Sequence, residues 1–368
     1  MVRSALFILT FLFFVNMQLI AQSEPLKVGV AGLSHSHVHS ILGRKDIGDI
    51  KIVGIAEPNR ELAQRYSEQH GFSMDLVYNS LEEMIVATQP EAVTAFGSIF
   101  EHLKVVETCA PKGIHVMVEK PLAVSMEHAK KMKALAQKHN IHLLTNYETT
   151  WYPTNHEAKT LLDNGKIGSL HKVVVRDGHR GPVKIGVNEE FLEWLQDPVL
   201  NGGGAITDFG CYGANLSTWL LKGKKPNTVT AVTQQLQPEN NPNVDDDAVI
   251  ILTYDDCQAV LQPSWNWPIG RKDMELYGLT GAIFADNRNT LRVRMAEGYD
   301  GYDEEITTLE ERTYPYNDPF ALLVGVVRGS IQLNPEDLTA LENNMTVVEI
   351  LDAARKSAKT GKTIKLKK

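Results

Sequence analysis

The sequence predicts two domains: an α/β domain built on a doubly wound parallel sheet, then an α+β domain with a large, mostly antiparallel, open-faced sheet. From residue 27 onward, short apolar runs alternate with helical patterns in units of about 30 residues. After residue 148 the pattern changes to alternating polarity interrupted by turn residues, which favours antiparallel strands. A chain of 368 residues is long enough for two separate cores.

The first domain is expected to cover residues 26–147. Its strands are expected at residues 27–31, 51–56, 92–96, 113–118 and 141–145, and its helices at 38–42, 61–70, 81–87, 103–110 and 125–140. Ser125 is the expected N-cap of the last of these helices. That helix would bury Ala129, Met132 and Ala136 at steps of three and four residues.

The second domain is expected to cover residues 148–337 and to consist mainly of strands. The strands are expected at residues 171–176, 228–235, 248–254, 258–265, 273–279 and 282–285. Residues 338–360 form one more helical pattern, with Gly361 just beyond its end.

The first 21 residues have the features of a secretory signal peptide. Arg3 precedes an apolar run at residues 5–15, and Ala21 is a small residue at the expected cleavage point. The run is shorter than the roughly 20 apolar residues that span a bilayer. We therefore expect a periplasmic or secreted protein with no stable membrane insertion after cleavage; an uncleaved anchor is the alternative.

The composition argues against some classes of protein. A net charge of −8 and a pI of about 5.9 give no basic surface for nucleic acid. The three cysteines lie in unrelated elements without CxxC spacing, so they do not predict a disulfide framework.

Two motifs carry the candidate chemistry. Glu119-Lys120-Pro121 follows an apolar strand pattern, which places Lys120 at the carboxyl end of a buried strand, where open α/β sheets bind ligands. About ninety residues later, a triple glycine precedes Asp208 and Tyr212, which would lie on one side of a helix at residues 209–221. A lysine, an aspartate and a tyrosine can move a proton while a cofactor moves a hydride. The alternative is that Asp208 caps the helix and Tyr212 belongs to the core.

In this order and separation the motifs resemble the glucose–fructose oxidoreductase / inositol dehydrogenase / MocA family of NAD(P)-dependent sugar enzymes. The resemblance implies a Rossmann domain and a C-terminal helix that packs back on it. It also implies that Lys120 orients the substrate hydroxyl, that Asp208 sets the field around Lys120, and that Tyr212 is a proton donor or relay. Glu119 is then expected to contact the cofactor ribose or to hold the lysine.

The nucleotide loop departs from the family pattern. Where Gly-x-Gly-x-x-Gly is expected, residues 32–37 keep only Gly32. Ser34 has a hydroxyl that can bond a phosphate, whereas His37 should push the helix outward or aim its imidazole at the phosphates. His35 is a further candidate for a phosphate contact. The three histidines at 35, 37 and 39 do not converge on one helical face and no carboxylate completes the set, so we expect no metal.

Other residues are expected to complete the cofactor site. Glu57 ends the second strand, where an acid accepts bonds from the ribose hydroxyls and repels a 2′-phosphate, so NAD is expected rather than NADP. A solvated turn acid is the alternative for this residue. The remaining candidates for cofactor contacts are Arg60, Ser98 and His102.

The candidates for contacts with a sugar are Tyr147, Arg176, His179 and Trp194, together with Asp208 and Tyr212. Trp265 and Trp267 could stack on a pyranose, or they could be core residues.

The resulting hypothesis is an NAD-dependent oxidoreductase acting on a hydroxyl or keto group of a sugar, glycoside or polyol, for example a glycoside 3-dehydrogenase. Export favours a tightly bound cofactor, because free NAD is scarce outside the cytoplasm. One alternative is an NAD-dependent glycoside hydrolase or lyase that acts through a transient keto-sugar. A second is a non-catalytic sugar- or nucleotide-binding protein. We also expect a homodimer or homotetramer that forms through the open sheet face.

Overall fold

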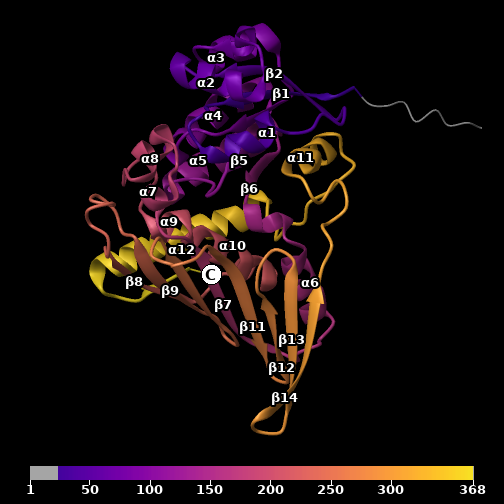
Figure 1. The fold of residues 1–368 in the computed structure, drawn as a ribbon, viewed down its shortest axis with the longest axis vertical. Coiled ribbons are helices and arrows are strands. Elements are labelled where there is room, and N and C mark those ends of the chain that lie inside the picture. The colour runs from indigo at the N-terminus through magenta and orange to yellow at the C-terminus, as the bar shows by residue number, and fades with distance from the viewer. Residues whose placement is uncertain (1–23, 368) are drawn as a thin grey trace, which may run out of the picture.

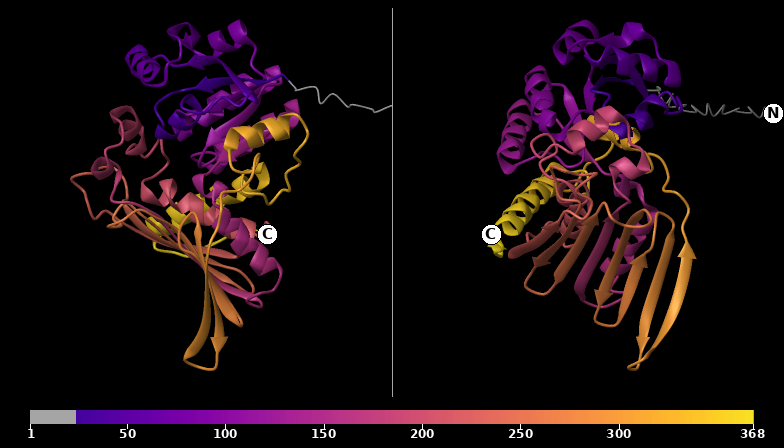
Figure 2. Two further views of the ribbon diagram at one scale, coloured as in Figure 1. Left: turned by 45° about the vertical axis from the view of Figure 1, so that its right-hand side comes forward. Right: turned by 60° about the vertical axis from the view of Figure 1, so that its left-hand side comes forward.

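The structure is a computed structural model that describes residues 24–367. The expected signal peptide, residues 1–21, lies outside the described residues. An α/β domain and a sheet-rich domain lie one above the other, and the long C-terminal helix runs between them (Figures 1 and 2). Within the described part of the chain, no helix combines the length and apolar character that crossing a membrane would need.

The first domain is the expected doubly wound sheet. Its six strands are all parallel, in the order β3-β2-β1-β4-β5-β6. The strands are β1 (Leu26–Ala31), β2 (Ile50–Ala56), β3 (Val77–Tyr78), β4 (Ala92–Ala95), β5 (His115–Glu119) and β6 (Leu143–Asn146). The helices are α1 (His39–Leu42), α2 (Arg60–His70), α3 (Leu81–Thr88), α4 (His102–Cys109) and α5 (Met126–His139). The strand order reverses between β1 and β4, and this is the point where such sheets bind ligands.

Local sequence explains where these helices begin and end. Asn59, Ser80 and Ser125 each accept a hydrogen bond from the main-chain N–H three residues further on, which caps α2, α3 and α5. The expected role of Ser125 is therefore confirmed. Gly71 and Asn140 end α2 and α5 in the left-handed conformation.

The second domain is a sheet of nine strands in the order β14-β13-β12-β11-β7-β10-β9-β8-β15. The strands are β7 (Leu170–Gly178), β8 (Thr228–Gln234), β9 (Asp247–Thr253), β10 (Gln258–Ser264), β11 (Arg271–Gly278), β12 (Gly281–Ala285), β13 (Thr290–Glu297), β14 (Gly301–Thr308) and β15 (Ile364–Lys365). β7 and β10 pair in parallel, and the other pairs are antiparallel. β13, β14 and the short β15 extend the sheet beyond the six strands expected from the sequence.

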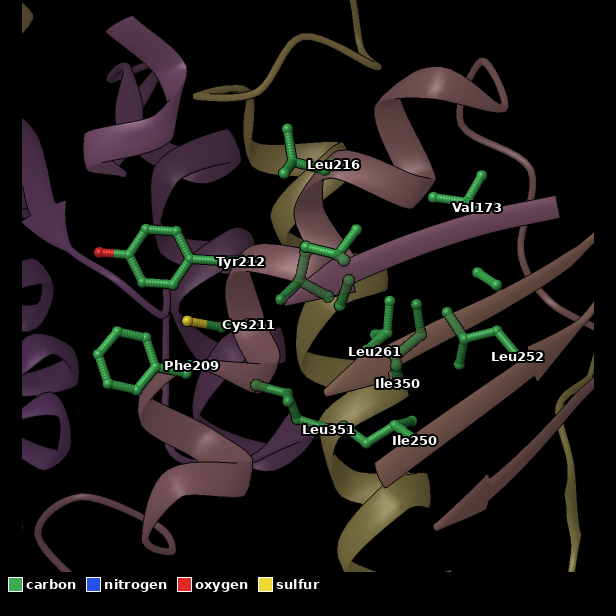
Figure 3. Close-up of a cluster of buried hydrophobic side chains, with 14 of the residues drawn as sticks. Val173, Phe209, Cys211, Tyr212, Leu216, Ile250, Leu252, Leu261, Ile350 and Leu351 are labelled. Carbon is green, nitrogen blue, oxygen red and sulfur yellow. The ribbon is translucent and has the colours of Figure 1, made fainter. Parts of the chain in front are cut away.

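Helices cover one side of this sheet and leave the other side bare (Figure 2). The helices that pack on it are α6 (Pro153–Asp163), α9 (Ala205–Asp208), α10 (Gly210–Leu220) and the C-terminal helix. α7 (Pro182–Ile185) and α8 (Glu189–Leu195) lie above the sheet, beside the first domain (Figure 1). Every residue of α10 is buried. Figure 3 shows why: aliphatic side chains of the sheet and of the C-terminal helix, such as Leu261 and Leu351, pack beside it. Short 3-10 turns occur at Ser36–Val38, Met74–Leu76, Ile99–Glu101, Ala110–Lys112 and Glu148–Trp151.

The last two helices join the domains. α12 (Leu341–Thr360) contributes Val348 to a core of the first domain and Leu351 to the core of the second. The C-terminal helix therefore packs on both domains. α11 (Pro319–Val327) was not expected, and Phe320 lies in the same buried cluster as Val28 of β1. This segment packs with the first domain, although its sequence position falls within residues 148–337.

Candidate active site

Lys120 lies where the sequence placed it, directly after β5, and its side chain is buried. Its ammonium forms an ion pair with the Asp208 carboxylate and also donates to the Asp208 main-chain carbonyl at 3.1 Å. The second oxygen of the carboxylate accepts a hydrogen bond from the indole N–H of Trp265 at 3.0 Å. Trp265 thus holds the acid in place and is fully buried itself.

The triple glycine positions Asp208 through a close main-chain contact. A Cβ on Gly204 would lie 1.8 Å from the carbonyl oxygen of Asp245, so only glycine fits. The Asp245 carboxylate accepts hydrogen bonds from the N–H groups of Gly204 and Ile206 at 2.9 and 2.7 Å. These bonds fix the start of α9, and Asp208 is its last residue.

Each partner of the Lys120–Asp208 pair stabilises the charge of the other. Burial alone would lower the pKa of Lys120, but the Asp208 carboxylate outweighs it and raises that pKa above its ordinary value. Burial alone would raise the pKa of Asp208, and Lys120 lowers it instead. In the resting site the lysine is therefore an ammonium and the acid a carboxylate.

Tyr212 lies on α10 beside this pair. The Lys120 ammonium is 5.4 Å from the centre of the Tyr212 ring, and Tyr147 meets that ring edge-on at 5.4 Å. In Figure 3 the side chains of Phe209, Cys211 and Tyr212 point away from the aliphatic core. Burial raises the pKa of Tyr212 well above its ordinary value, so its phenol keeps its proton. The structure thus brings Lys120, Asp208, Tyr212 and Tyr147 together, as expected.

A second ion pair, which the sequence did not indicate, lies next to Tyr212. The Lys272 ammonium bonds the Glu148 carboxylate and lies 5.3 Å from the centre of the Tyr212 ring. Tyr152 donates its hydroxyl to the same carboxylate at 2.6 Å. Burial would raise the pKa of Glu148, but Lys272 outweighs it and lowers the pKa to about 2.

β7 ends at the site and presents alternate side chains to its two faces. Asp177 is buried on the helix-covered side with Val173 and Val175, whereas Arg176 pairs with Glu275 on the other side. Arg176, a residue predicted to contact substrate, is therefore not brought to Lys120. Asp177 was not singled out from the sequence.

His179 follows β7 and remains close to the site. Its ring meets Phe209 edge-on at 5.0 Å. Burial lowers its pKa, while the Asp208 charge opposes the shift. Its Nδ1 accepts a hydrogen bond from the Gly181 N–H at 3.0 Å, so in the neutral ring the proton is on Nε2.

A cavity of about 780 Å³ lies beside His179 and the Glu148–Lys272 pair, next to β11. Charged and polar side chains of strands and loops line it, including Glu148, His179, Lys272, Asp273, Asn287 and Arg288. This lining is suited to hydroxyl-rich molecules, because both donors and acceptors are present.

A second cavity, of about 330 Å³, lies at the carboxyl edge of β1, β2 and β4. Gly32 lines it at φ +79°, where a Cβ would lie 2.8 Å from the Gly97 nitrogen. Glu57 lines it too, and its two oxygens accept the N–H groups of Leu33 and Asn59, each at 2.8 Å. Burial raises the pKa of Glu57.

His102 also lines this cavity. Its Nδ1 lies 3.2 Å from the Leu122 carbonyl, and its Nε2 is buried without a partner among the described residues. Burial lowers its pKa to about 4. The ring is thus neutral, with Nδ1 as donor and Nε2 as an unused acceptor.

The side chains of Arg60 and Ser98, which were also predicted to contact the cofactor, bond other parts of the protein. Arg60 donates to the Val77 carbonyl at 3.2 Å. The Ser98 hydroxyl bonds Glu101 at 2.8 Å and caps the turn before α4. Neither side chain lines the 330 Å³ cavity.

Two histidines of the nucleotide loop, His35 and His37, lie close to the Glu119 carboxylate, which was not expected. His37 bonds Glu119 at 2.9 Å, and one ligand atom each of His35, His37 and Glu119 lies within 4.8 Å of the others. The expectation that no carboxylate joins these histidines is therefore wrong. The Lys120 ammonium next to Glu119 opposes a cation here, and the absence of a metal stays a prediction.

The loop is also covered by the second domain. Trp194 of α8 donates its indole N–H to the Ser34 hydroxyl at 3.0 Å, and Phe191 packs on the His35 ring with centroids 4.6 Å apart. Trp194, expected to contact substrate, lies instead on the nucleotide loop. His35 is turned into this aromatic contact rather than into the 330 Å³ cavity.

Comparison with known proteins identifies the class. Residues 26–147 match the oxidoreductase family with an NAD-binding Rossmann fold, and residues 155–284 match the GFO/IDH/MocA C-terminal domain. The chain belongs to this family, which confirms the resemblance read from its motifs.

Among curated relatives, a trans-1,2-dihydrobenzene-1,2-diol dehydrogenase of Xenopus laevis is 31% identical over 186 residues, which are 50% of this chain and 52% of that protein. The D-xylose 1-dehydrogenase (NADP+) of Haloarcula marismortui is 24% identical over 221 residues, 60% of each chain. These matches span about half to three fifths of the relatives' length.

Solved structures share the fold over nearly the whole chain. An aldose–aldose oxidoreductase from Caulobacter crescentus, complexed with glycerol, has a TM-score of 0.75 at 20% identity and covers 93% of this chain and 100% of its own. GenD2 of gentamicin A biosynthesis, in complex with NAD, has a TM-score of 0.76 at 22% identity and covers 94% of this chain and 98% of its own.

Proposed function

We propose that this protein is an NAD-dependent oxidoreductase that acts on a hydroxyl or keto group of a sugar, glycoside or polyol. The single observation that carries the proposal is the buried Lys120–Asp208 pair next to Tyr212. Two cavities are lined by other residues of the site, His102 in one and Lys272 in the other. One cavity lies at the sheet edge where dinucleotides bind, and the other is lined with charged and polar groups.

The residues at the sheet edge fit a dinucleotide. Gly32 leaves room for close approach, Glu57 can accept ribose hydroxyls, and the unpartnered His102 Nε2 is a further acceptor in the described part of the chain. A buried acceptor without a donor is costly, and a ribose hydroxyl would satisfy it. The Glu57 carboxylate would repel a 2′-phosphate, which favours NAD over NADP. When bound, NAD would supply the hydride acceptor or donor.

Lys120 handles the proton at the substrate oxygen. As an ammonium it can donate to a carbonyl oxygen that is being reduced, with Tyr212 as a second donor. In the oxidation direction Lys120 must first lose a proton, so that its amine can take the hydroxyl proton. Asp208 keeps the lysine oriented and favours its charged form. The tyrosine acts as donor or relay.

We further propose an exported protein whose nucleotide dissociates slowly. The apolar run at residues 5–15 supports export. The cover formed by Trp194 and Phe191 over the nucleotide loop supports slow release. A retained cofactor would be recycled between two substrates.

The bare face of the second sheet supports a homodimer or homotetramer. Exposed apolar side chains such as Tyr302 and Ile306 lie on β14 at its edge. Large exposed apolar areas of this kind commonly mark contacts between subunits.

The decisive experiment begins with native mass spectrometry of the purified protein for bound nucleotide. A glycoside panel is then followed both by NADH absorbance and by release of the aglycone. The proposal predicts a bound dinucleotide and its reduction by one glycoside, without aglycone release. Release of aglycone with no net NADH would indicate glycoside cleavage through a transient keto-sugar instead. Lys120→Ala should abolish turnover and keep the nucleotide; retained turnover would remove the lysine from the mechanism.

A further inference from the structure

A third cavity, of about 220 Å³, lies where the second domain meets α11 and the chain that leads to it. Its walls come from the turn Glu148–Trp151, from α6 and α10, and from the chain between β14 and α12. The chain between β14 and α11 returns past α6 toward the first domain (Figure 1). The described residues that line this cavity line neither the 330 Å³ nor the 780 Å³ cavity, so it is separate from both.

Arg312 brings a positive charge to this cavity without a carboxylate partner. Within residues 24–367 its guanidinium makes one long hydrogen bond, 3.4 Å to the Thr150 carbonyl, and lies 5.3 Å from the centre of the Tyr316 ring. Burial lowers the pKa of Arg312. In six other described arginines with a shifted pKa, a bonded carboxylate raises it instead. Arg312 is thus a partly buried cation with unused N–H donors, which an anion would satisfy.

The Thr150 hydroxyl is a second unused group on the cavity wall. Only 5% of the residue is exposed, and its Oγ1 has no hydrogen-bond partner in the described part of the chain. The carbonyl of the same residue is the group that Arg312 bonds, so the guanidinium and the hydroxyl lie at the same part of the wall. A carboxylate accepts hydrogen bonds from both kinds of donor.

The charges around the cavity favour a ligand with one negative charge. Arg312 is the single cationic side chain on the described walls, because burial and the Arg312 charge lower the pKa of His156 to about 4. Asp337 also lines the cavity, and its Oδ2 accepts the Asn334 N–H at 2.7 Å. Its carboxylate forms no ion pair with Arg312, and it would repel a second negative charge on the ligand.

The other walls are mostly apolar. They are formed by the side chains of Trp151, Trp219, Leu322, Leu333 and Leu338. An inorganic anion would leave these walls without contacts, whereas an organic acid would cover them with its hydrocarbon part.

We infer that this cavity binds a small organic monocarboxylate with an apolar body, whose carboxylate accepts hydrogen bonds from Arg312 and Thr150. Such a ligand would join the chain between β14 and α11 to the turn Glu148–Trp151, so its binding should stabilise the fold. The inference goes beyond the proposed function and does not depend on it.

The test measures binding of benzoate, phenylacetate and hexanoate to the full protein, by calorimetry and by the midpoint of thermal unfolding. Each acid is compared with its neutral amide, which has nearly the same shape. At least one acid should bind and raise the midpoint, and it should bind roughly 10-fold or more tightly than its amide, as expected for hydrogen bonds to a charged group. Inorganic phosphate should bind more weakly than that acid.

Variants locate the binding. Arg312→Gln should weaken binding of the acid roughly 10- to 100-fold, and Thr150→Val roughly 2- to 10-fold. Arg312→Lys keeps the charge but not the planar fork of donors, so its affinity should be intermediate. Arg65→Gln, which removes an exposed arginine of α2, is the matched control and should bind like wild type.

Four results would overturn the inference. The first is the absence of binding by all three acids, and the second is equal binding of each acid and its amide. The third is unchanged affinity in Arg312→Gln, and the fourth is tighter binding of phosphate than of any acid. Thermal unfolding without ligand is a further check: Arg312→Gln should keep the wild-type midpoint, and a lower midpoint would show that the guanidinium stabilises the fold itself and would also contradict the inference. These measurements need no turnover, so they stand apart from any failure of the proposed function.

Discussion

The Lys120 ammonium bonds Asp208 twice, at the carboxylate and at the main-chain carbonyl, across 88 residues of sequence. Lys120 follows a strand of the Rossmann domain, and Asp208 ends a helix of the second domain. The pair thus links the two domains and is the chemical centre that we propose, so its removal should affect stability as well as turnover.

Lys120→Met should lower the free energy of unfolding by about 3–5 kcal/mol, because it leaves the buried Asp208 carboxylate without its cation. The double variant Lys120→Met/Asp208→Asn should recover most of that loss and still show no turnover. Chemical denaturation and steady-state kinetics measure the two effects separately. A double variant as unstable as the single one would contradict the pairing as the source of the loss.

The rate of alcohol oxidation should rise with pH from 7 to at least 10. The reason is that oxidation requires the neutral amine of Lys120, and Asp208 raises the pKa of Lys120 above its ordinary value. Carbonyl reduction uses the ammonium, so it should stay nearly constant over the same range. Both directions are measured as pH profiles of kcat on one substrate pair. An oxidation rate that levels off near pH 7 would indicate a different base.

His102 should make the protein less stable in mild acid. Its pKa is lowered by burial from 6.5 to about 4, so the folded protein resists a proton that the unfolded chain accepts. Above pH 6.5 this difference in pKa does not reduce the free energy of unfolding. As the pH falls to about 4, the free energy of unfolding decreases progressively, by about 3 kcal/mol in total. Denaturation curves between pH 8 and 4 should therefore show a weaker pH dependence for His102→Gln than for wild type. If the free energy of unfolding depended on pH equally in wild type and His102→Gln, the pKa of His102 would not be lowered in the folded protein.

Gly204→Ala should disrupt the second domain near the site. The added Cβ would lie 1.8 Å from the Asp245 carbonyl oxygen, which belongs to main chain and cannot move without displacing α9. We expect a loss of at least about 3 kcal/mol of stability, as for other forced overpacking, and strongly reduced turnover because Asp208 moves. Gly186→Ala is the control for backbone strain alone, because Gly186 has a positive φ but an added Cβ there would meet no described atom within 4 Å. Similar losses in both variants would remove the steric explanation.

The parts of the site that follow from local sequence were predictable. Lys120 lies at a strand end because an apolar run of β5 precedes it. The triple glycine that precedes Asp208 was also visible in the sequence, and Gly204 within it makes the close main-chain contact. The Glu148–Lys272 pair was not predictable, since its partners are 124 residues apart and meet only in the folded chain, one in the turn Glu148–Trp151 and the other on β11. Arg176 and Asp177 are adjacent in sequence, and only the pleat of β7 decides which of them faces the helices.

The contact between Trp194 and Ser34 provides a test of nucleotide retention. Removing the indole donor in Trp194→Phe should speed the release of bound nucleotide roughly fivefold, as expected for one neutral hydrogen bond of about 1 kcal/mol. Ser34→Ala should have a similar effect, and the double variant should be no faster than either single one, because both changes remove the same bond. Release is followed by dilution of the loaded protein and fluorescence of the reduced nucleotide. Additive effects would show that the two side chains act on the nucleotide separately, with Ser34 bonding a phosphate as its place in the loop first suggested.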